Sequence, residues 1–368
     1  MKYLFAAGGT AGHINPAVSI AEIIKKRDRK AEIFFLGSLH GIENKLLKSS
    51  GYPLYRIAIQ GFERRFSLKN IRSLYYALCA PSRAKQIIKK LSPSVVIGTG
   101  GYVSWPAAVA AHALNIPVVL HESNAYPGLS VRMAEKSADK ILLNFEEAKR
   151  YLKMPKKAVT VGNPIRSGFT ETRASARRRL GLRDSDLLLL SFGGSLGASV
   201  INEAMLSWLS ETGKNIENLY CVHGLGLNES EKYADYAKRH ALPKRFHILP
   251  YIDSISTLMR AADITVSRAG ASTVSELAAS RAAAILIPSP YVAEDHQTKN
   301  ATALEKKRAA ILLSEKTLTK QTFSDALQVL IDSPERREEL RKNIAEFYFP
   351  ETDAFIYREI ASLIMNNL

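Results

Sequence analysis

The chain opens with an apolar, strand-like run that ends in glycines and leads directly into a helix. Residues 3–7 form the run, and the turn at 8–13 is rich in glycine, which permits positive φ and a close approach of backbone to a ligand. Asn15 suits the N-cap of the next helix and Pro16 its first position, which predicts an amphipathic helix over residues 17–26. Such a turn indicates a ligand-binding loop at the end of a buried strand.

The second half of the chain repeats this opening, because the apolar run 187–192 is followed by the glycine turn 193–197 and a helical pattern. Further strand-like runs alternate with helical patterns, which is typical of parallel, doubly wound sheets. These runs are 32–36, 95–97, 117–120, 140–143 and 158–161 in the first half, and 219–223, 246–249, 264–266, 283–287 and 310–313 in the second. We therefore predict an α/β fold with two Rossmann-like, doubly wound domains that face a central cleft.

The domain boundary is expected just after residue 166. The segment 170–183 is polar and rich in arginine, as expected for a linker followed by a leading helix. We predict a first domain over residues 1–166 and a second over 167–350. The C-terminal segment 351–368 has a helical pattern and is expected to pack back on the first domain.

Composition limits the kinds of binding partner and the cellular compartment that we expect for this protein. The chain has 51 Lys and Arg against 35 Asp and Glu, a formal net charge of +16, which favours an anionic partner: a nucleic acid, an acidic membrane surface or a phosphorylated substrate. The sequence carries no nucleic-acid-binding signature, so we expect no nucleic-acid partner. Two cysteines exclude a disulfide framework, and the N-terminal run lacks the pattern of a signal peptide, so we expect a cytoplasmic protein.

The segment 95–120 carries no charged side chain apart from a titratable His112 and is long enough to span a bilayer. Glycines and prolines divide it into shorter pieces. We therefore predict a strand, a glycine turn, a helix and a second strand, with the strands buried on both faces of a sheet, and no membrane span.

The segment 264–276 places a helix start at the end of a strand, where backbone N–H groups can bind a diphosphate. Spacing alone leaves two interpretations of Thr273 and Glu276 open. The pair matches a capping box, which would only stabilise the helix. Alternatively, Glu276 accepts hydrogen bonds from ribose hydroxyls, as an acidic residue does in nucleotide-binding folds.

His13 is the candidate general base, because an imidazole can accept a proton near neutral pH from a hydroxyl that approaches the turn. A histidine in a glycine turn can also bond a neighbouring carbonyl or support a phosphate. The eight histidines show no metal-ligand spacing, so we predict no metal requirement and no cofactor. A G-x-S-x-G elbow and a Walker A lysine are absent from the sequence, which disfavours acyl transfer and P-loop chemistry.

Ile71, Leu74, Tyr75 and Leu78 recur at helical spacing in a basic segment. The basic residues around them are Arg64, Arg65, Lys69, Arg72, Arg83, Lys85, Lys89 and Lys90. The pattern fits a membrane-surface patch, in which each basic residue adds about 1 kcal/mol of attraction to anionic lipid. It also fits a core-facing helix with a solvated basic face. The net charge of +16 favours the interpretation of this segment as a membrane-surface patch.

Seven motifs, taken in order, resemble the MurG family, the bacterial transferases that add N-acetylglucosamine to the undecaprenyl-diphosphate-linked muramyl pentapeptide in peptidoglycan synthesis. They span nearly the whole chain. They are Gly8-Gly-Thr-Ala-Gly-His13, Gly98-Thr-Gly-Gly-Tyr-Val-Ser104, His121-Glu-Ser-Asn124, Gly162-Asn-Pro-Ile-Arg166, Gly193-Gly-Ser195-Leu-Gly-Ala, Gly270-Ala-Ser-Thr-Val-Ser-Glu276 and Asp295-His-Gln297. One departure stands out, because the family's first turn often has glycine where this chain has Ala11.

The resemblance implies the GT-B fold, with UDP-N-acetylglucosamine bound by the C-terminal half and the lipid-linked acceptor met by the N-terminal half. It implies a peripheral protein at the cytoplasmic face of the cell membrane, in contact with an anionic surface. In the donor half it implies that Ile252 contacts uracil through its backbone, that Ser195 and the turn of Ala271, Ser272 and Thr273 hold the diphosphate, that Glu276 binds ribose and that Gln297 contacts the sugar. It also implies that the substrate-binding cleft is completed from the other side by Thr10, Ala11, Gly12, Asn124 and Arg166.

The implied reaction is an inverting, metal-independent displacement. The acceptor's muramyl 4-hydroxyl attacks the anomeric carbon, UDP leaves, and His13 takes the proton. The alternatives are another GT-B enzyme acting on a UDP-sugar, such as a diacylglycerol glycosyltransferase or an epimerase, and a non-catalytic sugar-nucleotide-binding subunit. The motif that begins at His121 disfavours the first alternative, and intact motifs in both halves disfavour the second.

Overall fold

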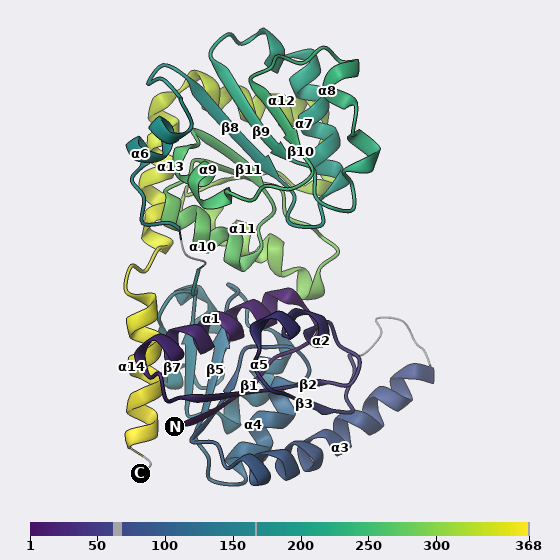
Figure 1. Cartoon of the computed structure of the whole chain (residues 1–368), viewed down its shortest axis with the longest axis vertical. Helices are drawn as coiled ribbons and strands as arrows, with labels where there is room; N and C mark the ends of the chain where they lie inside the picture. Colours follow the sequence, from purple (N-terminus) through teal and green to yellow (C-terminus); the bar gives the residue numbers. More distant parts are fainter. Residues whose placement is uncertain (62–67, 166–167, 367–368) are drawn as a thin grey trace. The chain divides into compact units, whose positions relative to one another are not determined.

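The computed structural model describes residues 1–61, 68–165 and 168–366. The chain divides into two compact units: unit 1 is Met1–Ile165 with Phe349–Leu368, and unit 2 is Arg166–Tyr348. Each unit contains a sheet of parallel strands covered by helices (Figure 1). This arrangement confirms the predicted α/β class with two Rossmann-like sheets.

Unit 1 is built on a seven-stranded sheet with the order β3-β2-β1-β4-β5-β6-β7. Its strands are β1 (Lys2–Ala6), β2 (Glu32–Ser38), β3 (Leu54–Ile57), β4 (Val95–Gly98), β5 (Val118–Glu122), β6 (Lys140–Leu143) and β7 (Ala158–Thr160). No strand was predicted at β3. This edge strand is half-buried and carries an exposed arginine, Arg56, so it lacks the continuous apolar run of the central strands.

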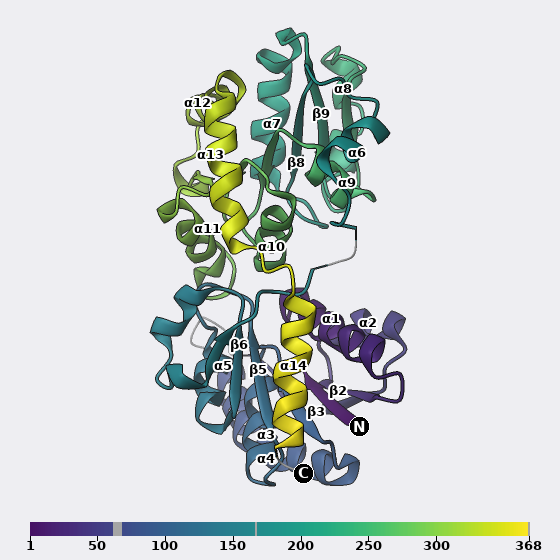
Figure 2. The same ribbon diagram turned by 90° about the vertical axis from the view of Figure 1, so that its left-hand side faces the viewer.

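The helices of unit 1 are α1 (Ala11–Arg27), α2 (Glu43–Leu46), α3 (Leu68–Leu91), α4 (Ser104–His112), α5 (Leu129–Ala134) and α14 (Thr352–Met365). Ile356, Ile360 and Ile364 of α14 are buried in a cluster with residues of β1 and α1. Lys140 of β6 and Glu359 of α14 form an ion pair with an N–O distance of 2.6 Å. Figure 2 shows α14 beside α1 on this face of the sheet. The last helix therefore completes the core of unit 1.

The first helix starts earlier than predicted. α1 begins at Ala11, with Thr10 in the N-cap position and in extended backbone, so the expected N-cap at Asn15 is wrong and Pro16 lies inside the helix. A proline at that position removes one N–H donor from the helix. The earlier start places His13 on the first turn of α1.

The apolar segment 95–120 folds as predicted. It forms β4, a glycine turn, α4 and β5, and the two strands pair in parallel. None of the helices in the described part of the chain is long and apolar enough to cross a membrane.

Unit 2 is built on a six-stranded sheet with the order β10-β9-β8-β11-β12-β13. Its strands, all on predicted runs, are β8 (Leu187–Phe192), β9 (Leu219–Gly224), β10 (Phe246–Leu249), β11 (Ile264–Ser267), β12 (Ala284–Leu286) and β13 (Ile311–Leu312). Its helices are α6 (Arg173–Arg179), α7 (Ser199–Glu211), α8 (Tyr236–Arg239), α9 (Ile255–Ala261), α10 (Ala271–Ser280), α11 (His296–Lys306), α12 (Lys320–Asp332) and α13 (Pro334–Ile344). A separate buried cluster forms the core of this unit between α7, α12 and the strands.

An ion-pair cluster around Asp263 ties several elements of unit 2 together. This buried carboxylate, just before β11, accepts hydrogen bonds from Arg173 at 2.6 Å, Arg177 at 2.8 Å and Arg341 at 3.4 Å. It also accepts from the backbone N–H of Leu188 at 2.9 Å. One carboxylate thus connects α6, α13 and β8.

Candidate active site

The first glycine turn holds the ring of His13 in one orientation. His13 Nδ1 lies 3.2 Å from the carbonyl oxygen of Gly8 and 3.1 Å from Thr10 Oγ1. A carbonyl oxygen only accepts hydrogen bonds, so this contact requires the proton on Nδ1 and leaves the lone pair of the neutral ring on Nε2. Ala11 has no positive φ, so alanine fits the position where the family often has glycine. Ala11 and Gly12 are exposed beside His13.

A second glycine turn, after β4, packs against the first. Thr99 Oγ1 donates to the carbonyl oxygen of His13 at 2.7 Å. A Cβ at Gly100 would stand 2.4 Å from His13 Cδ2, and one at Gly101 would stand 2.0 Å from the carbonyl oxygen of Gly8. Only glycine allows such close approach, and both residues have positive φ. Thr99, Gly100 and Gly101 were not predicted as site residues, although they lie within a recognised motif.

The loop after β5 holds Asn124 on a buried carboxylate. Glu122 Oε1 accepts from the backbone N–H and the Nδ2 of Asn124, at 2.9 and 3.0 Å, and Oε2 accepts from the N–H of Gly128 at 2.8 Å. The carboxyl ends of β1, β4 and β5 are adjacent in the sheet, so the turns that carry His13 and Asn124 lie at one edge of unit 1. Glu122 was not predicted as a site residue, although it lies within a recognised motif.

Two other histidines, His121 and His223, are fully buried and are not candidates for the general base. Burial lowers the pKa of His121, at the end of β5, to about 4, and that of His223, on β9, to the same value. His121 Nδ1 lies 3.4 Å from Ser123 Oγ, which donates to Asn163 Oδ1 at 3.0 Å. At neutral pH both rings are uncharged and shielded from a substrate, so His13 remains the candidate base.

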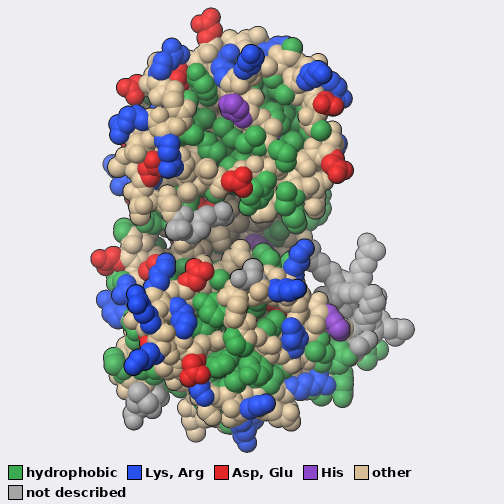
Figure 3. Space-filling model, in the orientation of Figure 1, with side chains coloured by type: hydrophobic (Ala, Val, Ile, Leu, Met, Phe, Trp, Pro, Cys, Tyr) green, Lys and Arg blue, Asp and Glu red, His purple; other side chains and the backbone are tan. Residues whose placement is uncertain are grey.

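The apolar stripe of α3 is exposed. Ile71, Leu74, Tyr75 and Leu78 are 67%, 52%, 58% and 71% exposed, so the alternative of a core-facing stripe is wrong. The side chain of Arg72 lies outside the described part of the structure. Figure 3 shows Lys and Arg side chains on the visible faces of both units, so positive charge is not confined to this helix.

In unit 2, the turn after β8 leads into α7. Gly194 and Gly197 have φ values of +101° and +95°. A Cβ at Gly194 would have no atom within 4 Å, whereas one at Gly197 would lie 2.3 Å from the carbonyl oxygen of Leu225. Ser195 lies between the two glycines and is exposed. The turn is therefore anchored at one end and open to a ligand at the other.

The N-terminus of α10 follows β11 and has a glycine as its N-cap. Gly270 is the N-cap and makes no side-chain capping bond, so no side chain of the cap satisfies the first-turn N–H groups of Ala271, Ser272 and Thr273. Thr273 is the third helical residue, so the capping-box alternative is wrong. Glu276 is buried one turn further on. The positive end of this helix suits a diphosphate.

Ile252 and Gln297 follow two further strands, β10 and β12, at the same edge of the sheet. Ile252 follows β10 and is buried. Gln297 is on the first turn of α11, and its Oε1 accepts from the backbone N–H of Ser289 at 2.9 Å. The buried Asn300 donates through Nδ2 to the carbonyl oxygen of Ala269 at 3.1 Å, which ties α11 to the turn before α10. Asn300 was not predicted as a site residue.

The structure thus gathers the predicted residues within each unit. In unit 2, Ser195 and Ile252 lie on the loops that follow β8 and β10, and the other predicted donor residues lie in α10 and α11, which follow β11 and β12. In unit 1, Thr10 and Asn124 lie on the loops that follow β1 and β5, and Ala11, Gly12 and His13 form the first turn of α1. Arg166 lies outside the described residues. Over the residues that the structure describes, no group of three or more His, Cys, Asp or Glu side chains is placed to hold a metal ion.

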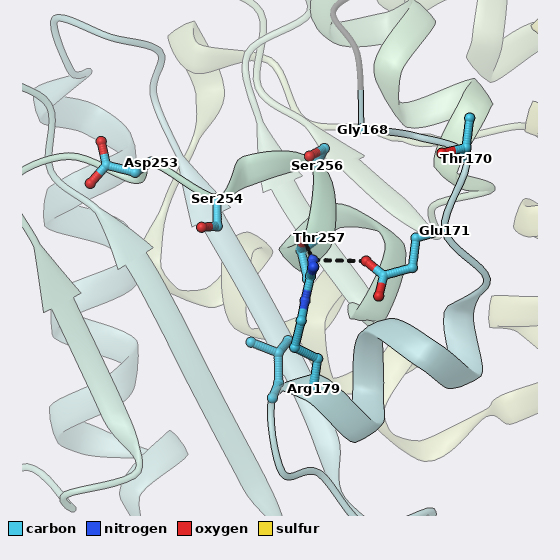
Figure 4. Close-up of a pocket in the computed structure, with 9 residues that line it drawn as sticks. Gly168, Thr170, Glu171, Arg179, Asp253, Ser254, Ser256 and Thr257 are labelled. Atoms are coloured by element: carbon cyan, nitrogen blue, oxygen red, sulfur yellow. Dashed lines mark hydrogen bonds and ion pairs between the residues drawn. The ribbon is translucent and has the colours of Figure 1, made fainter.

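A pocket of about 920 Å³ lies beside α6 and α9 in unit 2 (Figure 4). Arg179 pairs with Glu171 at 2.8 Å inside it and also donates to Thr257 Oγ1. The lining residue Asp253 follows Ile252 in the sequence, but none of the predicted donor-site residues lines the pocket. We therefore do not assign this pocket to the donor.

Comparison with known proteins gives matches over the whole chain. A Thermoanaerobacter protein named UDP-N-acetylglucosamine–N-acetylmuramyl-(pentapeptide) pyrophosphoryl-undecaprenol N-acetylglucosamine transferase is 38% identical over 366 residues, which cover 99% of this chain and 100% of the relative. The protein of the same name from Acetivibrio thermocellus is 37% identical over 369 residues, which cover 100% and 99%. The crystal structure of MurG from Acinetobacter baumannii matches with a TM-score of 0.80 at 26% identity, over 98% of this chain and 99% of that one.

Two family models also match. The glycosyltransferase family 28 N-terminal domain covers residues 3–143, and the family 28 C-terminal domain covers residues 188–354. Fold, site and matches together define a glycosyltransferase. The full-length relatives narrow this class, and the chain belongs to the MurG family of N-acetylglucosamine transferases. A UDP-N-acetylglucosamine 2-epimerase from Neisseria meningitidis shares the fold, with a TM-score of 0.65 at 14% identity over 98% of this chain and 100% of that one. The family resemblance and the GT-B fold are confirmed, and the alternative functions are not favoured.

Proposed function

We propose that this chain transfers N-acetylglucosamine from UDP-N-acetylglucosamine to the 4-hydroxyl of a muramyl pentapeptide carried on undecaprenyl diphosphate. Membership of the family over the full length supports this reaction. The observation that carries the residue assignment is the orientation of His13, whose Nδ1–H bonds Gly8 and leaves Nε2 as the acceptor of a proton. Thr10, Ala11, Gly12 and Asn124 of unit 1, together with Arg166, would meet the acceptor.

Unit 2 is the proposed donor-binding half. The glycine-capped N-terminus of α10 and the exposed Ser195 would offer backbone N–H groups to the diphosphate of UDP. Glu276 would accept hydrogen bonds from the ribose hydroxyls, the backbone of Ile252 would contact uracil, and Gln297 would contact the sugar. These residues lie on loops and helices that follow strands of one sheet, and open α/β sheets bind their ligands beyond the carboxyl ends of such strands.

In the proposed mechanism the acceptor oxygen attacks the anomeric carbon from the face opposite to the diphosphate, which inverts the configuration there. A new C–O bond to the acceptor forms as the bond to the diphosphate oxygen breaks. The hydroxyl proton passes to Nε2 of His13, and UDP leaves with the electron pair. The first-turn N–H groups of α10, from Ala271 to Thr273, stabilise the charge that develops on the diphosphate, so no metal ion is needed for that task.

The acceptor is lipid-linked, and the exposed stripe of α3 gives unit 1 a surface suited to a membrane. Ile71, Leu74, Tyr75 and Leu78 lie on one face of the helix, and Arg83, Lys85, Lys89 and Lys90 follow on the same helix. Apolar side chains that enter the interface and basic side chains that attract anionic lipid act together in peripheral binding. We propose that the protein works as a peripheral protein on the cytoplasmic face of the cell membrane.

The test is UDP release from UDP-N-acetylglucosamine, measured with and without the lipid-linked acceptor. His13→Ala is expected to lower kcat by roughly 100-fold or more, the usual contribution of a general base, with little change in UDP affinity.

Glu276→Ala is expected to weaken UDP binding by about tenfold, because it removes a buried acceptor of hydrogen bonds. His112→Ala, an exposed histidine at the end of α4, is the control. Unchanged turnover in His13→Ala would remove the base role, and acceptor-independent release alone would contradict the proposed reaction.

A further inference from the structure

Glu43 is a buried carboxylate that the proposed reaction does not use. It is the first residue of α2 and has no exposed surface. Its Oε1 accepts from both the N–H and the Oγ of Ser38, each at 2.7 Å, and its Oε2 accepts from the backbone N–H of Gly9 at 3.2 Å. Three glycines surround it so closely that a Cβ would lie 3.0 Å (Gly8), 2.7 Å (Gly37) or 2.1 Å (Gly41) from a Glu43 atom. A buried carboxylate persists only where donors offset its desolvation, and here one donor is the glycine turn itself.

The bond to Gly9 matters because of the peptide group that it fixes. The N–H of Gly9 and the C=O of Gly8 belong to one planar, trans peptide unit, so they point in opposite directions. Glu43 accepts from the N–H, and His13 Nδ1 lies 3.2 Å from the carbonyl oxygen. A single peptide group therefore joins the carboxylate to the imidazole.

We propose that Glu43 is a positioning residue that acts on His13 through the Gly8–Gly9 peptide. The negative carboxylate polarises the amide, which makes its carbonyl oxygen a stronger acceptor for Nδ1–H. The consequence is that the proton stays on Nδ1 and the lone pair on Nε2, and that the imidazolium formed during proton transfer is stabilised. The inference rests on the proposed role of His13 as the base.

Tyr102 closes the same turn from another side. Its ring covers Gly9 so closely that a Cβ there would lie 2.9 Å from Tyr102 Cε1. Burial is the main cause that raises the pKa of Tyr102, so this phenol is neutral at the pH of the reaction. The negative charge next to the turn therefore comes from Glu43.

The experiment compares Glu43→Gln, which keeps the shape and removes the charge, with Glu135→Gln. Glu135 is equally buried in unit 1 and accepts from the backbone N–H of Met154, away from the glycine turns. In Glu43→Gln we expect kcat to fall roughly 10–100-fold, as for other groups that orient a functional histidine, with an unchanged KM for UDP-N-acetylglucosamine. Nitrogen-15 NMR of the histidine rings is expected to show the Nδ1–H form of His13 in the parent protein and in Glu135→Gln. Glu43→Gln is expected to show a mixture of tautomers and a lower pKa of His13.

An unchanged tautomer and pKa of His13 in Glu43→Gln would overturn the proposal, whatever happens to the rate. If Glu43→Gln does not fold, Glu43→Asp keeps the charge but shortens the reach to Gly9, and the same change in tautomer is expected. His13→Ala separates the two proposals. Unchanged turnover in that variant would exclude the base role, while the NMR signals of His13 would still decide whether Glu43 orients the ring.

Discussion

His121 and His223 make the fold sensitive to acid. Burial lowers the pKa of each from the ordinary value of 6.5 to about 4. Below pH 6.5 the unfolded chain binds protons that the folded protein does not, so the free energy of unfolding falls as the pH drops from 6.5 towards 4. Above that window these two side chains contribute no pH dependence.

At pH 5.5, one unit below the ordinary value, we expect each buried histidine to cost about 1.4 kcal/mol of stability relative to pH 7.5. Urea unfolding at the two pH values tests this expectation. His223→Gln should reduce the difference between the two pH values by about that amount. His112→Gln, at an exposed position, should leave the difference unchanged. The same pH dependence in all three proteins would contradict the assignment to burial.

The sequence offers candidate site residues but not the contacts that hold them. His13 and Glu276 stand in motifs whose glycines and helix starts have a recognisable spacing. Glu43 and Glu122 were missed, because a glutamate that will be buried looks like any surface glutamate in a sequence. Their burial depends on donors from other segments, such as Gly9 for Glu43, and those pairings arise only in the folded chain.

At the scale of elements, most strands could be predicted because central parallel strands are apolar without interruption. The start of α1 could not be predicted from the sequence. Local preference favoured Asn15 and Pro16, but the hydrogen bond from Thr99 to the carbonyl oxygen of His13 holds the turn in a form from which the helix begins at Ala11. Tertiary contacts override weak local propensities in this way.

The exposed stripe of α3 leads to a prediction about membrane binding. Ile71→Ser with Leu78→Ser should lower the partition of the protein onto anionic vesicles by about tenfold or more, since each large apolar side chain contributes about 1–2 kcal/mol on burial. Val329→Ser, at a half-exposed site on α12 of unit 2, is the matched control. Sedimentation with vesicles measures the effect, and equal loss in the control would contradict a specific role for α3.

At the scale of the whole molecule, each unit has its own sheet and its own buried core. Domains of this kind unfold as separate cooperative units when the interface between them is modest. The sequence could predict both cores, because the repeated strand–turn–helix opening marks each of them. It could not predict the cluster at Asp263, whose arginine partners come from α6 and α13.

We expect UDP to raise the unfolding temperature of unit 2 while leaving the transition of unit 1 in place, because a ligand stabilises only the fold that binds it. Differential scanning calorimetry with and without UDP measures the two transitions. Asp263→Asn identifies unit 2, since weakening a buried ion-pair network costs about 3–5 kcal/mol and should lower that transition alone. A UDP shift confined to the other transition would contradict donor binding by unit 2.

The packing of α14 on β1 and α1 has a consequence for how the protein is made. The segments that form this core lie near opposite ends of the chain, and all of unit 2 is translated between them. The whole of unit 2 is therefore synthesised before Ile356, Ile360 and Ile364 can pack on the apolar residues of β1 and α1. The core of unit 1 can therefore be completed only after all of unit 2 has been synthesised, so its closing step falls at the very end of translation.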